Sequence, residues 1–134
     1  MTREELIEKL IFDKTLQTPR IIKAFKSIDR RDFVLPEYQI EAYEDKPLSI
    51  GYEATISQPT TVAIMLEKLQ PKTGGKILEI GTGSGYLTAL LAYIAGESGE
   101  IFSVEYNAEL KEFEESNLKK YNFRNINLFT VDGK

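Results

Sequence analysis

Three alternating glycines follow an apolar segment near the middle of the chain, and they constrain its fold more than any other feature. The segment KILEI, residues 76–80, runs into LEIGTGSGY, residues 78–86, in which Gly81, Gly83 and Gly85 stand two positions apart. Glycine lets a backbone turn sharply and approach a ligand without interference from a Cβ atom. A helix that begins after such a turn presents free N–H groups to a ligand. The pattern predicts a strand, a turn and a helix that bind a nucleotide-like ligand; the alternative is a turn that serves packing only.

Strand and helix patterns alternate from Pro59 to the end of the chain. Short apolar strands are predicted at residues 76–80, 101–105 and 126–131. The apolar residues at helical spacing that predict the three helices are Val62, Met65, Leu66 and Leu69, then Leu87, Leu90, Leu91 and Ile94, then Leu110, Phe113 and Leu118. This order predicts an α/β fold with right-handed crossovers and a parallel sheet. Its ligand crevice should lie beyond the carboxyl ends of the strands.

Two short helices are predicted before residue 30. Thr2 and Glu5 form a capping box at the start of the first helix. Thr18 and Pro19 are the N-cap and first residue of the second helix, which should end near Asp29. Their apolar stripes consist of Leu6, Ile7, Leu10 and Ile11 in the first helix, and of Ile21, Ile22, Phe25 and Ile28 in the second.

Residues 33–58 show no regular periodicity and are interrupted by Pro36, Pro47 and Gly51. A long irregular segment of this kind is uncommon in a compact domain unless it binds something. We therefore expect a binding loop here. The chain should form one structural domain, in which residues 1–58 supply helices and this loop and residues 59–134 supply the α/β part.

The residue types present exclude several kinds of chemistry. The chain has 134 residues, enough for one core, and contains neither His nor Cys. Disulfides, thiolate metal sites, zinc-hydrolase sites and Ser-His triads are therefore excluded within it. A formal net charge of −4, without a cluster of Lys and Arg, argues against a nucleic-acid surface. No apolar run is long enough for a membrane span, and MTREELIEKL is typical of a capped helix rather than a signal peptide, so we expect a cytoplasmic protein.

Acidic residues stand at the carboxyl ends of all three predicted strands. Glu79 precedes the glycine turn, where a carboxylate would repel a pyrophosphate and suits an ammonium or sulfonium charge. Glu105 lies 24 residues after Gly81, near the spacing at which an acid accepts hydrogen bonds from ribose hydroxyls. Asp132 closes the third strand and should meet the other end of an adenosine. Each acid alone could be a solvated strand end.

The choice of ligand depends on the sixth position of the glycine pattern. A dinucleotide fingerprint has glycine there, whereas this chain has Tyr86, so NAD is disfavoured. The glycines and the three acids together describe S-adenosylmethionine better than NAD.

Four segments in a fixed order resemble one protein family. AYEDKPLSIGYEATISQP, KILEIGTGSGYLTALLA, SVE and VDG are similar to the protein-L-isoaspartate O-methyltransferase family, over essentially the whole chain. The SIG and TISQP segments distinguish this family from others, because the glycine pattern alone fits most methyltransferases of this architecture. The resemblance implies a Rossmann-like class I methyltransferase sheet, with helices on both faces and a helical segment before it. It also implies methyl transfer from S-adenosylmethionine to the carboxylate of isoaspartyl residues in damaged proteins, after which the ester closes to a succinimide.

The same resemblance assigns roles to individual residues. Ser57 is implied to be the catalytic serine, whose hydroxyl orients the substrate carboxylate; the alternative is a cap for the helix that begins at Pro59. No general base is needed, because a carboxyl group with a pKa of about 4 is already ionised at neutral pH. The expected cofactor-binding residues are Ala54, Thr55, Ile56, Ser57, Glu79, Gly81, Gly83, Gly85, Glu105, Asp132 and Gly133, and no metal is expected.

The chain departs from the family near its C-terminal end. Val131 stands where members usually have glycine, and the family's sheet continues for several strands beyond Lys134. Residues 59–134 would then form the first half of the cofactor-binding domain, truncated after the third strand, and KILEI would have one unpaired edge. Either this edge pairs with another copy to give a homodimer, or the N-terminal segment covers it. The rival to an enzyme is a non-catalytic adenosylmethionine-binding module, and a fragment of an NAD-dependent oxidoreductase is disfavoured.

Overall fold

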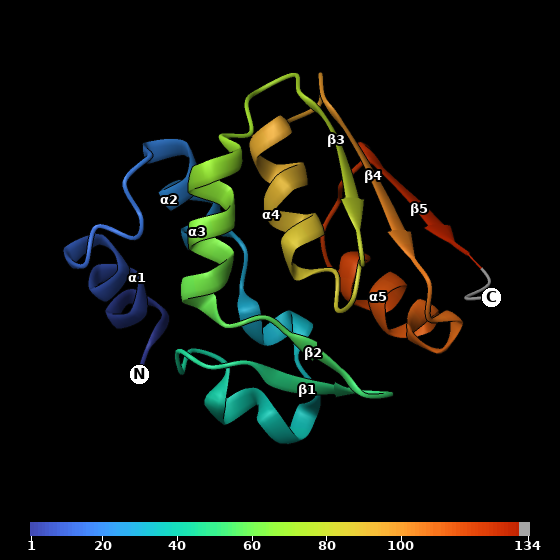
Figure 1. Cartoon of the computed structure of the whole chain (residues 1–134), viewed down its shortest axis with the longest axis horizontal. Coiled ribbons are helices and arrows are strands. Elements are labelled where there is room, and N and C mark those ends of the chain that lie inside the picture. Colours follow the sequence, from blue (N-terminus) through green and yellow to red (C-terminus); the bar gives the residue numbers. More distant parts are fainter. Residues whose placement is uncertain (132–134) are drawn as a thin grey trace.

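A three-stranded parallel sheet organises the computed structural model, which describes residues 1–131 (Figure 1). Its strands are β3 (Lys76–Ile80), β4 (Glu100–Glu105) and β5 (Ile126–Thr130), in the order β3-β4-β5. The sheet is built from short apolar runs, as buried parallel strands are. The predicted α/β class and parallel sheet are confirmed, and the strand ends differ from the expected ones by at most one residue.

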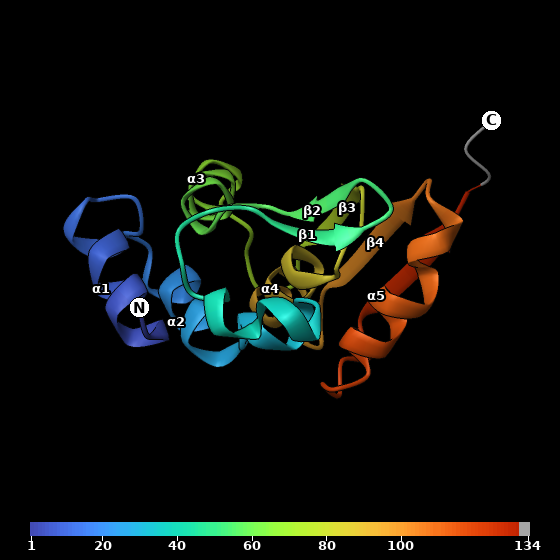
Figure 2. The ribbon, with the colours of Figure 1, turned by 90° about the horizontal axis from the view of Figure 1, so that it is seen from below.

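Helices α4 (Tyr86–Ala95) and α5 (Lys111–Leu118) cover one face of the sheet (Figure 2). Almost every residue of α4 is buried, because this helix packs between the sheet and the N-terminal helices. A 3-10 turn, η3 (Ala108–Leu110), leads into α5. Helix α3 (Pro59–Leu69) lies beside the N-terminal helices (Figure 1). Within the described part of the chain, no helix has the length and apolar character to cross a membrane.

The opposite face of the sheet is open among residues 1–131. Glu79 points toward α4, so Leu78 and Ile80 point the other way, because side chains alternate along a strand. Ile80 stands beside Val104, which stands beside Phe129 on β5. Leu78, Ile80 and Phe129 are 65%, 62% and 49% exposed. We expected helices on both faces of the parallel sheet. Within the described residues, helices cover only the face on which α4 and α5 lie.

The two N-terminal helices are α1 (Arg3–Phe12) and α2 (Pro19–Ser27). The predicted capping box of α1 is present, but Ile11, expected in its apolar stripe, is 40% exposed. Helix α2 ends two residues before Asp29. Thr18 stands at its N-cap but makes no capping bond, because its hydroxyl donates to Glu67 of α3 at 2.6 Å.

Residues 33–58 are more regular than expected. After the 3-10 turns η1 (Arg30–Phe33) and η2 (Pro36–Glu41), strands β1 (Leu48–Gly51) and β2 (Ala54–Ile56) pair as an antiparallel hairpin. At its tip, Gly51, Tyr52 and Glu53 have φ angles of 90°, 53° and 61°. Two-residue hairpin turns of this hand usually carry Asn-Gly or Asp-Gly. The Tyr-Glu pair lacks that signal, which is why the hairpin was not predicted.

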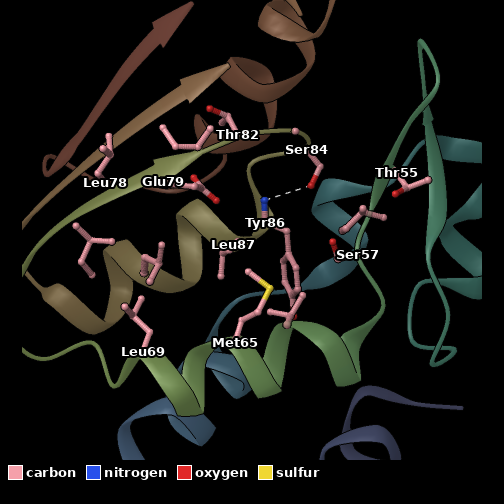
Figure 3. Close-up of a pocket in the computed structure, with 17 residues that line it drawn as sticks. Thr55, Ser57, Met65, Leu69, Leu78, Glu79, Thr82, Ser84, Tyr86 and Leu87 are labelled. Atoms are coloured by element: carbon pink, nitrogen blue, oxygen red, sulfur yellow. Dashed lines mark hydrogen bonds between the residues drawn. The ribbon is translucent and has the colours of Figure 1, made fainter. Parts of the chain in front are cut away.

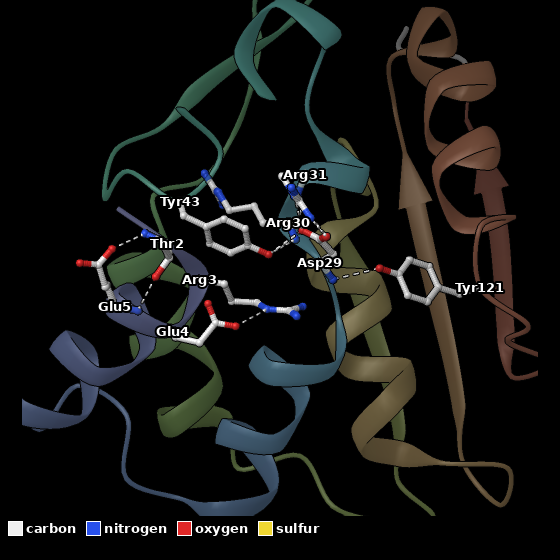
Figure 4. Close-up of polar contacts among 9 residues, drawn as sticks. All are labelled: Thr2, Arg3, Glu4, Glu5, Asp29, Arg30, Arg31, Tyr43 and Tyr121. Carbon is white, nitrogen blue, oxygen red and sulfur yellow. Dashed lines mark hydrogen bonds and ion pairs between the residues drawn. The ribbon is translucent and has the colours of Figure 1, made fainter. Parts of the chain in front are cut away.

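A polar network ties the N-terminal segment to the turn after α5 (Figure 4). The Tyr121 hydroxyl accepts the N–H of Asp29 at 2.9 Å and donates to the carboxylate of Asp32 at 2.6 Å. The carboxylate of Asp29 accepts the hydroxyl of Tyr43 at 2.7 Å and pairs with Arg31 at 2.9 Å. Segments 89 to 92 residues apart in sequence are thereby held together.

One carboxyl group lies in the core without a partner. Glu114, on the inner side of α5, is fully buried, and neither of its oxygens has a hydrogen-bond partner. Burial, reinforced by the nearby charges of Glu105, Glu115 and Glu79, raises the pKa of Glu114 to about 8. The group is therefore protonated in the folded chain at neutral pH and ionised in the unfolded chain.

Replacing Glu114 should stabilise the chain more at high pH than at low pH. Folding takes up a proton at Glu114 between its ordinary pKa of 4.5 and about 8, so its contribution makes the folded state less stable as pH rises through that window. Glu114→Met removes this effect at similar volume. We expect thermal unfolding to show a gain of roughly a few degrees at pH 8 and a smaller gain at pH 5.5. Glu112→Gln, on the exposed side of α5, is the matched control; an equal gain for Glu114→Met at both pH values would contradict the assignment.

Candidate functional site

A cavity of about 350 Å³ lies along β3, between this strand and helices α3 and α4, and reaches the glycine turn at the carboxyl end of β3 (Figure 3). Its walls come from the end of β2, from α3, and from the segment that runs from β3 through the glycine turn into α4. Hydroxyl-bearing side chains gather at the end formed by β2 and the glycine turn, and leucine and methionine side chains lie at the other end. The lining residues are Thr55, Ile56, Ser57, Val62, Met65, Leu69, Ile77, Leu78, Glu79, Ile80, Gly81, Thr82, Gly83, Ser84, Tyr86, Leu87 and Leu91.

The glycine turn has a backbone that glycine adopts readily and other residues rarely do. Gly81, Gly83 and Gly85 have φ angles of 93°, 57° and 91°. A Cβ atom at Gly85 would lie 3.1 Å from Leu118, whereas one at Gly81 would meet no atom within 4 Å. The turn therefore packs closely against α5 on one side and leaves open space on the other.

Glu105 fastens the glycine turn to the end of β4. One oxygen of its carboxylate accepts the N–H of Gly83 at 2.8 Å, and the other accepts the N–H of Asn107 at 2.8 Å. The side chain is 7% exposed and does not line the cavity. Both oxygens keep lone pairs beyond those used by the backbone. Sequence reasoning missed this structural role of Glu105. The expected contact with ribose hydroxyls stays a prediction.

Glu79 is a buried carboxyl group that lines the cavity. Its Oε1 atom accepts the hydroxyl of Thr88 and, at 2.6 Å, the hydroxyl of Ser103. Burial raises the pKa of Glu79 to about 7, against the opposite effect of these two hydroxyls and with a small addition from Glu105. A cation placed in the cavity would favour the ionised form. The group is thus poised to hold a positive charge.

Ser57 stands on the cavity wall facing the glycine turn (Figure 3). Its carbonyl oxygen accepts a hydrogen bond from the guanidinium of Arg30 at 2.9 Å. The N-cap residue of α3 is Gln58, so Ser57 lies one position outside the helix. The alternative reading of Ser57 as a helix cap is therefore wrong.

The capping role belongs to Asp45, which lies far from α3 in sequence. Its carboxylate accepts the N–H of Thr60 at 3.0 Å and the hydroxyl of Thr60 at 2.6 Å. It also pairs with Lys9 at 3.2 Å. A side-chain oxygen that accepts the N–H of the second helical residue satisfies one of the free donors at a helix start.

The structure brings part of the predicted set together. The predicted residues that line the cavity are Thr55, Ile56, Ser57, Glu79, Gly81 and Gly83. Those that support it without lining it are Ala54, Gly85 and Glu105. Asp132 and Gly133 lie outside the described residues, and Val131, the last described residue, donates its N–H to the carbonyl of Glu105 at 2.8 Å.

Several residues that shape the site were missed. Arg30 and Asp45 act from outside the glycine pattern, and no sequence signal identified them. Thr88 and Ser103 could have been found, because each is a hydroxyl residue within an otherwise apolar helix or strand. Among residues 1–131, no group of three or more acidic side chains is placed to hold a metal ion.

The fold and the cavity together define a class. A parallel sheet, a left-handed glycine turn at the carboxyl end of its first strand, and an acid at the end of the second are features of Rossmann-like sheets that bind nucleotide-type ligands, the architecture that class I methyltransferases share. The cavity runs along β3 and ends at the turn between this strand and α4.

Comparisons with known proteins agree with this class. A family model described as protein-L-isoaspartate(D-aspartate) O-methyltransferase matches residues 1–134. A protein-L-isoaspartate O-methyltransferase of Pyrobaculum islandicum is 39% identical over 96% of this chain and 63% of its own length. A solved protein-L-isoaspartate O-methyltransferase superposes with a TM-score of 0.86 at 33% identity, covering 98% of this chain and 43% of that one. A Plasmodium falciparum structure in complex with S-adenosyl-L-homocysteine superposes at 0.81 over 100% of this chain and 63% of that one; at 23% identity it shows the fold alone.

The chain belongs to the protein-L-isoaspartate(D-aspartate) O-methyltransferase family. It spans less than two thirds of the length of these relatives.

Two substitutions should separate the roles of Ser57 and Asp45 in stability. Ser57→Ala removes an exposed hydroxyl that caps nothing, so the melting temperature should stay within about a degree of the original. Asp45→Ala removes the cap of α3 and should lower the free energy of unfolding by about 1 to 2 kcal/mol, measured by urea unfolding. A larger loss of unfolding free energy for Ser57→Ala than for Asp45→Ala would contradict this assignment.

Proposed function

We propose that this chain binds S-adenosylmethionine in the cavity beside β3 and the glycine turn, and carries the site that directs methyl transfer to the carboxylate of isoaspartyl residues in damaged proteins. The observation that carries the proposal is the position of Ser57. The TISQP segment that resembles the family brings this hydroxyl to the cavity wall facing the glycine turn. A substrate side chain entering beside Ser57 would meet a ligand held by that turn.

The residues present fit the proposed cofactor. The glycine turn leaves open space where Cβ atoms would otherwise project, and the cavity is large enough for part of a nucleoside. Glu79 supplies a carboxyl group whose charge would favour an ammonium or sulfonium centre. Glu105 keeps lone pairs for ribose hydroxyls, and Asp132 and Gly133 are proposed to meet the adenine end.

The proposed chemistry needs orientation and not a base. Bound S-adenosylmethionine supplies a methyl group on a positively charged sulfur, which an ionised carboxylate can attack directly. Ser57 would donate its hydroxyl hydrogen to one carboxylate oxygen and leave the other aimed at the methyl carbon. Thr55 and Ile56 would limit the access of water from the hairpin side.

The remaining parts of the proposal concern organisation and partners. Residues 1–58 would supply the substrate side and residues 59–134 the cofactor side of one domain. The partners would be isoaspartyl peptides and proteins in the cytoplasm. Because β3 pairs with β4 alone within residues 1–131, its free edge would join two copies in a homodimer, which light scattering would detect as a doubled mass. The other alternative is cover of this edge by the N-terminal segment, which within residues 1–131 forms no strand pairing with β3.

Transfer to a peptide tests the proposal directly. With labelled S-adenosylmethionine, the chain should label an isoaspartyl peptide and leave the matching aspartyl peptide unlabelled. Ser57→Ala should lower kcat by about tenfold or more while leaving affinity for S-adenosylhomocysteine nearly unchanged, because only the orientation of the attack is lost. Binding of S-adenosylhomocysteine without any transfer would favour the rival, a non-catalytic binding module. Equal labelling of both peptides would refute the substrate assignment.

A further inference from the structure

Arg30 carries a buried positive charge that no carboxylate pairs with. Its side chain is fully buried at the start of η1, and among residues 1–131 no ion pair includes it. Burial lowers its pKa, but a guanidinium remains charged in proteins. One nitrogen, Nε, has no hydrogen-bond partner. Burying such a group is costly, and an apolar side chain would fill the same volume at a smaller cost.

The contacts of this guanidinium lead to the site. Its Nη1 atom donates to the carbonyl of Ser57 at 2.9 Å, and Nη2 donates to the carbonyl of Lys46 at 3.3 Å, just before β1. The main-chain N–H of Arg30 donates to the Tyr43 hydroxyl at 2.8 Å (Figure 4). Arg30 therefore holds both ends of the hairpin that carries the cavity wall.

The same guanidinium also reaches the start of α4. Its central carbon lies 5.4 Å from the ring centroid of Tyr86, within the range of a cation–π contact. Tyr86 is the first residue of α4, directly after Gly85, and its side chain lines the cavity. Phe33, three residues after Arg30, also packs on the Tyr86 ring at 5.6 Å.

We infer that Arg30 is a positioning residue that sets the spacing between Ser57 and the glycine turn. This inference rests on the proposed function, in which Ser57 orients the substrate carboxylate and the turn holds the methyl donor. One rigid side chain contacts the peptide of Ser57 on one side and the ring that begins α4 on the other. Movement of either wall would change the distance between the attacking oxygen and the methyl carbon.

The geometry requires arginine in particular. A guanidinium is flat and presents several donors in a fixed fork, so it can serve two carbonyls while its charge stays within cation–π range of the Tyr86 ring. The single ammonium of lysine could reach one carbonyl and could not serve the second carbonyl in the same position. Methionine would fill the space and make none of these polar contacts. Arg30→Lys should therefore disturb the site less than Arg30→Met.

The experiment compares Arg30→Lys and Arg30→Met with Arg31→Met in the full chain. Arg31 is the neighbouring exposed arginine, paired with Asp29, and serves as the matched control. Arg30→Met should lower kcat for an isoaspartyl peptide by about thirtyfold or more, with KM changed by less than about threefold, and Arg30→Lys should recover part of the loss. Arg31→Met should retain the original kcat. Original kcat in a folded Arg30→Met or Arg30→Lys variant would overturn the inference, and Arg30→Lys alone decides it if the methionine variant does not fold.

Hydrogen exchange separates this inference from the proposed function. In the presence of S-adenosylhomocysteine, the amides of residues 55–58 and of Thr60 should exchange faster in Arg30→Met than in the original chain, by about tenfold or more, while amides of α1 stay unchanged. If the original chain transfers no methyl group, the proposed function fails, and this measurement still decides the positional role. Unchanged exchange at residues 55–58 and Thr60, or a rise spread evenly over the whole chain, would overturn it.

Discussion

The hydrogen bonds of one buried carboxylate hold the turn on which the site depends. Glu105 ends β4 and accepts the N–H groups of Gly83 and Asn107, each at 2.8 Å. Hydrogen bonds to an ionised acceptor are stronger than those between neutral groups. They join the turn after β3 to the turn after β4, so the loop that faces the cavity is fixed relative to the sheet. The positions of the start of α4 and of the neighbouring cavity wall depend on these hydrogen bonds.

Local patterns predicted those parts of the fold that local chemistry determines. KILEI forms β3, as expected for a short apolar run that precedes a glycine turn. Thr2 and Glu5 form their capping box because both partners lie within one helical turn. The hairpin was missed since Tyr52 and Glu53 adopt left-handed backbone without the residues that signal it. The sequence pattern therefore predicted the parallel sheet and gave no signal for the turn of the β1–β2 hairpin.

Contacts between distant segments explain most of what the sequence could not predict about the site. Thr60 takes its cap from Asp45, 15 residues earlier, and Ser57 is held by Arg30, 27 residues earlier. Neither spacing corresponds to a helix or strand period, so no pattern identifies these pairs. The glycine turn and Glu79 could be predicted as neighbours because the strand and turn that carry them are consecutive, and Glu105 because the carboxyl ends of adjacent parallel strands meet at one edge of the sheet. The side chains that fix Ser57 depend on how the N-terminal segment packs against the sheet.

The cavity beside β3 is proposed to accept an adenosylmethionine-type ligand and not a dinucleotide. Calorimetric titration of the chain with S-adenosylhomocysteine, and separately with NAD, measures this directly. We expect saturable binding of S-adenosylhomocysteine at one site per chain, weakened about tenfold to a hundredfold by Glu105→Ala and little changed by Glu109→Ala, with no heat from NAD. Binding of NAD in the absence of S-adenosylhomocysteine binding would contradict it.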